Sequence, residues 1–287
     1  LFDSIVHAFG TAGTGGFGIK SDSIAGYSKA AQWVITVGMF LFGVNFNLYY
    51  LILIKKFKSA IRSQELWVYS GLVVGSTFII AFNILNLCSN FAEALRLSAF
   101  QVCSIISTTG YSTTNFDLWP SLSKTILLLL MFSGGCAGST AGGIKVSRLV
   151  IMWRTVKRDL KKALHPRTTS VVKFESRRVD EDTISGVSNY FLIYAFLFII
   201  ILLLLSLDPY CGFIQNSTFL SVFETNFTAT LTCFNNVGPG FGVVGPIYGF
   251  ANYSWFSKIV LSFAMLLGRL EIYPLLLTII PSTWIKK

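Results

Sequence analysis

The chain has 287 residues, of which 13% are charged and 53% are hydrophobic, and its mean hydropathy is +0.64. A soluble domain carries about 25% charged residues, so this composition excludes an ordinary soluble domain and indicates a protein of the lipid bilayer. Five regions approach the roughly 20 apolar residues that span a bilayer as a helix. They are residues 33–54, 66–88, 125–153, 190–207 and 259–285.

The net charge of +10 is concentrated in a few segments. Basic residues crowd residues 55–62 and 145–178, and the chain ends in Lys286 and Lys287. The positive-inside rule places these segments on the cytoplasmic side of a membrane. Because membrane orientation already accounts for the basic clusters, we expect no nucleic-acid binding. The five cysteines and two histidines lack metal-ligand spacing, which predicts neither a zinc site nor a disulfide framework.

In chain order, one pattern recurs: a short amphipathic segment, a glycine loop, and a long apolar helix. The short segments are residues 2–12, 91–107 and 216–234. The second and third are each preceded by a long helix. The first is not, so we expect that further sequence precedes Leu1. The loops that follow, residues 14–18, 108–112 and 236–240, are centred on Gly16, Gly110 and Gly238 and are called the three glycine loops below.

The short segments suit re-entrant pore helices, because they are too short to cross a bilayer. Irregular backbone is tolerated at membrane depth only where it is buried in protein or lines a watery cavity. Ringed carbonyl dipoles can replace the hydration shell of an alkali cation, so the three glycine loops predict a cation filter. The alternative is that each loop is a simple turn between two spans.

A second glycine-rich stretch, residues 134–143, interrupts the helical pattern that follows the second glycine loop. Glycine costs about 1 kcal/mol relative to alanine inside a helix, so this segment is not expected to stay helical. We call it the intramembrane loop and expect it to block or open the pathway below the filter. It is not a phosphate-binding loop, because Ile144 stands where that motif requires lysine.

Two charged residues, Arg269 and Glu271, fall inside the last apolar region. Ionisable residues within a span usually face the protein interior and serve function. We expect Arg269 to contact the intramembrane loop or the pore cavity and to help hold the loop shut. The alternative is a structural ion pair with another helix.

Together these motifs resemble the TrkH branch of the Trk/Ktr/HKT potassium transporters. The similar segments are residues 107–114 with Leu118-Trp119-Pro120, residues 134–145, residues 235–240, and residues 265–272 with their Arg-Leu-Glu. The resemblance covers the whole chain. It implies an all-α membrane protein of helix–pore loop–helix repeats arranged pseudo-fourfold around one central ion pore.

In that arrangement residues 1–62 end repeat two, 63–165 form repeat three, 166–183 are a cytoplasmic linker, and 184–287 form repeat four. The resemblance implies potassium ions at the filter positions, which are Thr14, Gly15, Gly16, Thr108, Thr109, Gly110, Asn236, Val237 and Gly238. It implies gating by Arg269 and by Gly134, Gly135, Gly138, Ser139, Thr140, Gly142 and Gly143 of the intramembrane loop.

The resemblance also implies a multi-pass protein of the plasma (inner) membrane that forms homodimers. Its partner would be a TrkA-like cytoplasmic regulatory subunit, and nucleotide would act only through that partner. No covalently bound cofactor is expected. The basic segment 157–178 is a candidate docking face, although ordinary positive-inside charge explains it equally well.

Two departures from the family pattern concern selectivity: the first loop of the family is absent, and the first copy here reads Thr-Gly-Gly-Phe-Gly. A sodium-permeable relative, an ion-coupled symporter and the pore subunit of an ATP-driven potassium pump therefore stay open as alternatives. The chain carries no Walker motif, phosphorylatable aspartate motif or catalytic-triad spacing, so it is not expected to be an enzyme.

Overall fold

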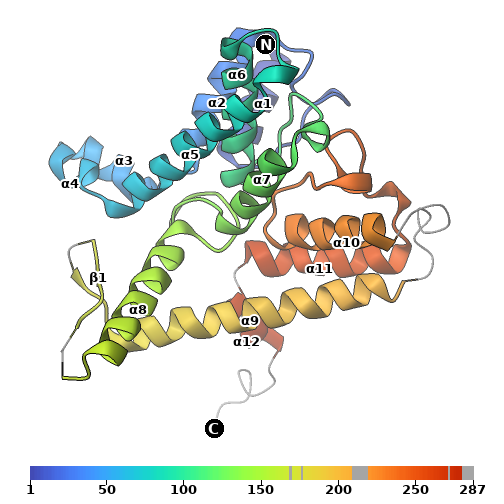
Figure 1. The fold of residues 1–287 in the computed structure, drawn as a ribbon. Coiled ribbons are helices and arrows are strands. Elements are labelled where there is room, and N and C mark those ends of the chain that lie inside the picture. The colour runs from blue at the N-terminus through green and yellow to red at the C-terminus, as the bar shows by residue number, and fades with distance from the viewer. Residues whose placement is uncertain (168–169, 176, 209–218, 271, 280–287) are drawn as a thin grey trace.

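The computed structural model describes residues 1–167, 170–175, 177–208, 219–270 and 272–279, and these are almost entirely helical (Figure 1). The longer helices are α1 (Phe2–Ala12), α2 (Lys29–Phe42), α5 (Gln64–Asn83), α6 (Phe91–Ile106), α7 (Ser121–Ser133), α8 (Val146–Leu164), α9 (Glu181–Ser206), α10 (Phe219–Phe234) and α11 (Trp255–Arg269). Shorter elements are α3 (Phe46–Leu53), α4 (Phe57–Ile61), α12 (Ile272–Ile279) and the antiparallel strands β1 (Lys173–Phe174) and β2 (Arg177–Arg178).

The helices pack in the order that the sequence pattern predicts. Each short helix contacts the long helices of its own repeat: α1 packs on α2, α6 on α5 and α7, and α10 on α9 and α11. The second helix of one repeat also packs on the short helix of the next, since α2 contacts α6 and α7 contacts α10. The same neighbour relation therefore occurs twice along the described chain, once between α2 and α6 and once between α7 and α10.

Within the described residues, two helices are long and apolar enough to cross a membrane by themselves, α5 with 20 residues and α9 with 26. On α9 the side chains of Leu192, Phe196, Ile199 and Leu203 are exposed at helical spacing, while Tyr194 and Phe198 are buried. An exposed apolar stripe on a helix of this length is typical of a surface that faces lipid rather than water.

The prediction of one helix over residues 33–54 is wrong. The chain forms α2 and α3, which are bent by 90° at residues 43–45. Asn45 caps α3, since its side chain accepts a hydrogen bond from Asn47 N at 2.8 Å. The groups freed at the break bond to the intramembrane loop, with Cys136 N donating to Gly43 O at 2.9 Å and Phe46 N donating to Gly138 O at 3.1 Å. These bonds compensate for the helical bonds lost at the bend.

The prediction of one helix over residues 259–285 is also wrong, because α11 ends at Arg269 and α12 begins at Ile272. Pro274 explains the interruption. Proline lacks the N–H needed inside a helix but is tolerated in a first turn, which is where Pro274 lies in α12. Glu271 and residues 280–287, which include Lys286 and Lys287, lie outside the described residues.

Polar contacts join successive helix–loop–helix units of the chain. Arg96 on α6 is 8% exposed and donates to the side chain of Gln32 on α2. Asp117, just before α7, lies 2.9 Å from Lys124 Nζ of α7 through Oδ1, and its Oδ2 accepts from Gly242 N, beyond α10, at 3.2 Å. These contacts hold the repeats in one orientation and so position the three glycine loops.

Gly268 allows α11 to approach the end of α10, and its replacement by alanine is expected to separate the two helices. A β-carbon at this position would lie 1.9 Å from Phe234 O. Overpacking of this kind costs about 1–3 kcal/mol. Gly268→Ala is therefore expected to lower the temperature at which the detergent-solubilised protein stays monodisperse. The matched control is Gly75→Ala in α5, where no atom lies within 4 Å of an added β-carbon. Equal stability of the two variants would contradict the proposed close contact.

Candidate ion pathway

The three short helices end in the same hydrogen-bonding motif. In each, two backbone N–H groups beyond the last helical turn bond back to carbonyls of the helix, which is the pattern of a Schellman C-cap. The bonds that reach back five residues are Gly15 N to Gly10 O (2.8 Å), Thr109 N to Ser104 O (2.9 Å) and Val237 N to Thr232 O (2.8 Å). The bonds that reach back three residues are Thr14 N to Thr11 O (3.2 Å), Thr108 N to Ile105 O (3.0 Å) and Asn236 N to Cys233 O (3.2 Å).

The motif requires a residue with left-handed backbone conformation immediately after the C-cap residue, and in all three loops that residue is not glycine. Thr14, Thr108 and Asn236 have φ of 48°, 55° and 56°. Left-handed threonine is uncommon because its branched β-carbon crowds the backbone. The side chains of these residues supply the compensating contacts. Thr14 Oγ1 donates to Thr140 O at 2.9 Å, Thr108 Oγ1 accepts from Gly142 N at 2.7 Å, and Asn236 Nδ2 donates to Met265 O at 3.1 Å.

The central glycines Gly16 and Gly110 let successive loops touch one another. Their φ values are +68° and +85°. A β-carbon on Gly16 would lie 1.8 Å from Thr109 O of the next loop, and one on Gly110 would lie 2.4 Å from Val237 O of the loop after that. Each of these two glycines thus lies against the carbonyl of the residue that precedes the central glycine of the following loop. Gly238 continues the series with φ of +105° and no atom closer than 3.6 Å to an added β-carbon.

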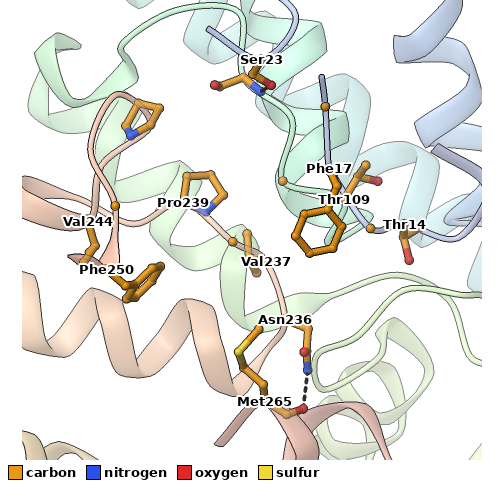
Figure 2. A pocket seen from close by; sticks show the side chains of 18 of the residues that line it. Thr14, Phe17, Ser23, Thr109, Asn236, Val237, Pro239, Val244, Phe250 and Met265 are labelled. Carbon is orange, nitrogen blue, oxygen red and sulfur yellow. Dashed lines mark hydrogen bonds between the residues drawn. The ribbon is translucent and has the colours of Figure 1, made fainter. Parts of the chain in front are cut away.

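The three glycine loops line one cavity of about 630 Å³ (Figure 2). Eight of the nine predicted filter residues line it; Thr108 does not and is buried behind it. The cavity is also lined by residues that were not predicted as filter positions, among them Phe17, Ser23, Phe250 and Met265. In Figure 2 the side chain of Asn236 points toward Met265, and a hydrogen bond joins the two residues.

Arg269 lines the same cavity and makes the contact that the sequence predicts. Its Nη1 donates to Thr140 O at 2.7 Å, and its Nη2 donates to Gly13 O at 3.2 Å. Thr140 O therefore accepts from both Arg269 and Thr14. The hydroxyl of Thr140 donates to Ala12 O at 3.2 Å. These bonds fasten the intramembrane loop to the end of α1.

The intramembrane loop is non-helical, as predicted: α7 ends at Ser133 and α8 begins at Val146. None of its residues lines the cavity of Figure 2, so the loop lies outside the space that the glycine loops enclose. The sequence analysis missed the break at residues 43–45 and the side chain of Glu65, whose Oε1 accepts from Ala137 N at 2.7 Å. One signal pointed to Glu65: it is an acidic residue at the edge of an otherwise uncharged span.

The residues that line the cavity include no His, Cys, Asp or Glu. In the part of the chain that the structure describes, no group of three or more His, Cys, Asp and Glu side chains could hold a metal ion. The donors available at the glycine loops are backbone carbonyls and threonine hydroxyls. Each loop also follows the C-terminal end of a helix, where the helix dipole carries partial negative charge.

Membrane-length helices with loops gathered at one cavity are typical of a helical membrane transporter. A family model described as "TrkH: Cation transport protein" matches residues 1–286. The chain therefore belongs to the TrkH family of cation transport proteins.

Individual relatives agree with this assignment. The chain is 33% identical to the Trk system potassium uptake protein TrkH of Salmonella typhimurium and 31% identical to the Trk system potassium uptake protein TrkG of Escherichia coli, in each case over 99% of this chain. It spans 57% and 56% of those two proteins. The crystal structure of the potassium transporter TrkH from Vibrio parahaemolyticus superposes with a TM-score of 0.87 at 30% identity, covering 99% of this chain and 59% of that one.

The hydrogen bond between Thr108 and Gly142 is expected to stabilise the fold, and a second buried threonine provides a matched control. Thr108→Val keeps the branched shape but leaves Gly142 N without its acceptor, which costs about 1–3 kcal/mol. Thr113 is also buried, and its hydroxyl has no hydrogen-bond partner among the described residues. Thr113→Val is therefore expected to be neutral or stabilising. Thermal unfolding in detergent distinguishes the two, and a loss in Thr113→Val as large as that in Thr108→Val would contradict this assignment.

Proposed function

We propose that this chain forms part of a potassium uptake pathway across the plasma (inner) membrane, with the three glycine loops as walls of its selectivity filter. The observation that carries the proposal is the repeated contact in which the central glycine of one loop lies against the carbonyl of the residue before the central glycine of the next. The ion-binding residues are Thr14, Gly15, Gly16, Thr108, Thr109, Gly110, Asn236, Val237 and Gly238.

A dehydrated potassium ion needs several oxygen ligands at once, because it has left its hydration shell behind. Carbonyl oxygens from loops around a common axis can replace that shell. The neighbour relation that recurs from repeat two to three and from three to four supports a rotational arrangement, and a pseudo-fourfold pore would extend it by one further repeat. In this proposal the helix dipoles of α1, α6 and α10 add a field that favours cations.

The intramembrane loop is the proposed gate, with Gly134, Gly135, Gly138, Ser139, Thr140, Gly142, Gly143 and Arg269 as its working residues. Support comes from the bonds of Arg269, which bridge Thr140 of the loop to Gly13 at the end of α1. A closed gate then corresponds to the loop held against the underside of the filter. Opening requires these bonds to break.

Control by a TrkA-like cytoplasmic nucleotide-binding subunit and assembly as a homodimer are also part of the proposal. Support is the similarity to proteins named as Trk system potassium uptake proteins, together with the basic segments 55–62 and 145–178, which the positive-inside rule assigns to the cytoplasm. Any ATP, ADP or NAD would act through that partner rather than on this chain.

The filter proposal predicts that replacement by alanine is tolerated at Gly15 but not at Gly16. Gly16→Ala forces a side chain into left-handed backbone and against Thr109 O, whereas Gly15→Ala meets only the flexible ring of Phe17 at 3.5 Å. Rubidium flux into liposomes is expected to fall by about tenfold or more in Gly16→Ala and to change little in Gly15→Ala. Equal flux in both variants would argue against a filter at Gly16. If the parent protein carries sodium as fast as rubidium, the alternative of a sodium-permeable transporter is favoured over potassium uptake.

The gate proposal predicts a change in resting flux when Arg269 is removed. Arg269→Ala loses two charge-assisted hydrogen bonds and is expected to raise rubidium flux without the regulatory subunit by about tenfold. Lys258→Ala is the control, because it removes the same charge from α11 and its side chain bonds to Ala251 O alone among the described residues. Unchanged flux and gating in Arg269→Ala would remove Arg269 from the gate.

A further inference from the structure

Glu65 is a buried carboxyl group at the start of α5, with 5% of its surface exposed. One of its oxygens, Oε1, accepts two backbone hydrogen bonds, from Ala137 N at 2.7 Å and from Ser147 N at 3.1 Å. Ala137 belongs to the intramembrane loop, and Ser147 belongs to the first turn of α8, which follows that loop. A single side-chain atom from α5 therefore joins the loop to the helix that leads away from it.

Both donors need a partner from outside their own segment. Ala137 lies in non-helical backbone, and the first N–H groups of α8 have no intrahelical acceptor. A buried N–H group without an acceptor costs about 1–3 kcal/mol. An acidic group is also favoured near a helix N-terminus, and Glu65 lies near two of them, its own in α5 and that of α8.

The same part of the loop has two further anchors, both made by backbone atoms at the break between α2 and α3. Cys136 N donates to Gly43 O, and Phe46 N donates to Gly138 O. The other end of the loop is held by Thr14, Thr108 and Arg269 beneath the glycine loops. A displacement of the start of α5 would therefore act first on residues 136–138 of the intramembrane loop.

A second acidic residue connects α5 to the β1–β2 hairpin. Glu175, which follows β1, accepts from Ser63 Oγ at 2.8 Å and from Glu65 N at 3.1 Å through the same oxygen. Arg154 on α8 reinforces this contact, since it donates to Gln64 Oε1 at 2.9 Å and to Lys173 O. The hairpin lies beside α8 in Figure 1, in the basic linker region. A displacement of the hairpin would act directly on the residues that carry the Glu65 side chain.

We propose that Glu65 is the positioning residue of the intramembrane loop, and that Glu175 links the β1–β2 hairpin to it. Glu65 holds residues 136–138 in place, and movement of the hairpin shifts the start of α5 and releases that end of the loop. The proposal deepens the gate described above and rests on it for its effect on ion flow. The position of the loop itself can be measured without ion flow.

Cys136 provides the measurement, because it lies in the loop and is 0% exposed. We would prepare membranes that contain the whole protein with Cys136 as its single cysteine and measure its rate of modification by a membrane-permeant maleimide. Glu65→Ala is expected to raise the rate about tenfold, because the loop loses its charge-assisted bond. Glu65→Gln keeps an acceptor oxygen at the same reach and is expected to stay close to the parent rate. Glu175→Ala is expected to fall between Glu65→Ala and the parent.

Two controls separate release of the loop from general loosening. Glu181→Ala removes a negative charge from the exposed start of α9, where the side chain pairs with Arg158, and is expected to leave the Cys136 rate unchanged. Cys103 and Cys233 are buried in α6 and α10, and single-cysteine proteins that retain either one report on the pore helices. Their rates are expected to stay constant in Glu65→Ala.

The proposal is overturned if Cys136 reacts at the parent rate in Glu65→Ala, or if Cys103 and Cys233 accelerate with it. Should Glu65→Ala fail to accumulate in membranes, Glu175→Ala decides the question, and an unchanged Cys136 rate there is the overturning result. Rubidium flux measured in parallel separates the two proposals. Faster labelling with unchanged flux supports Glu65 as the positioning residue and contradicts the gate function of the loop.

Discussion

Backbone N–H and C=O groups that leave a helix at membrane depth must find partners, because lipid offers none. This chain leaves regular helix at the three glycine loops, at the break between α2 and α3, and at the intramembrane loop. The rest of the architecture follows from how these groups pair. The glycine loops pair back onto their own helices through Schellman caps, whereas the break and the intramembrane loop are joined by two backbone hydrogen bonds, Cys136 N to Gly43 O and Phe46 N to Gly138 O.

Side-chain bonds join the first two glycine loops and the intramembrane loop into one hydrogen-bonded unit. Thr14 and Thr108 follow their helices in a strained conformation, and their hydroxyls bond to Thr140 O and Gly142 N of the loop. The residues that shape these two glycine loops are thus the same residues that hold the intramembrane loop. A movement of the intramembrane loop must break these bonds or carry the two glycine loops with it.

Local pattern was enough to predict most of the helices. The short segment 2–12 coincides with α1, and the glycine-rich stretch 134–143 is non-helical, because helix propensity and amphipathic periodicity act within a few residues. The same reasoning failed at residues 43–45. Nothing in the apolar run 33–54 signals a 90° bend, because the groups that compensate for it lie about 90 residues further along the chain, at Cys136 and Gly138. The end of α11 is different, because Pro274 is a local signal that argues against one helix over residues 259–285.

The sequence by itself determined the class of protein, the repeated glycine loops and the presence of a charged residue, Arg269, beside an interrupted helix. Apolar length, glycine spacing and charge are one-dimensional properties, so they can be read along the chain. Only the tertiary structure decided which loop carbonyl lies against which glycine, that Arg269 bonds to Thr140 and Gly13, and that Glu65 reaches Ala137. These contacts join residues far apart in sequence, and their formation depends on the packing of whole repeats against one another.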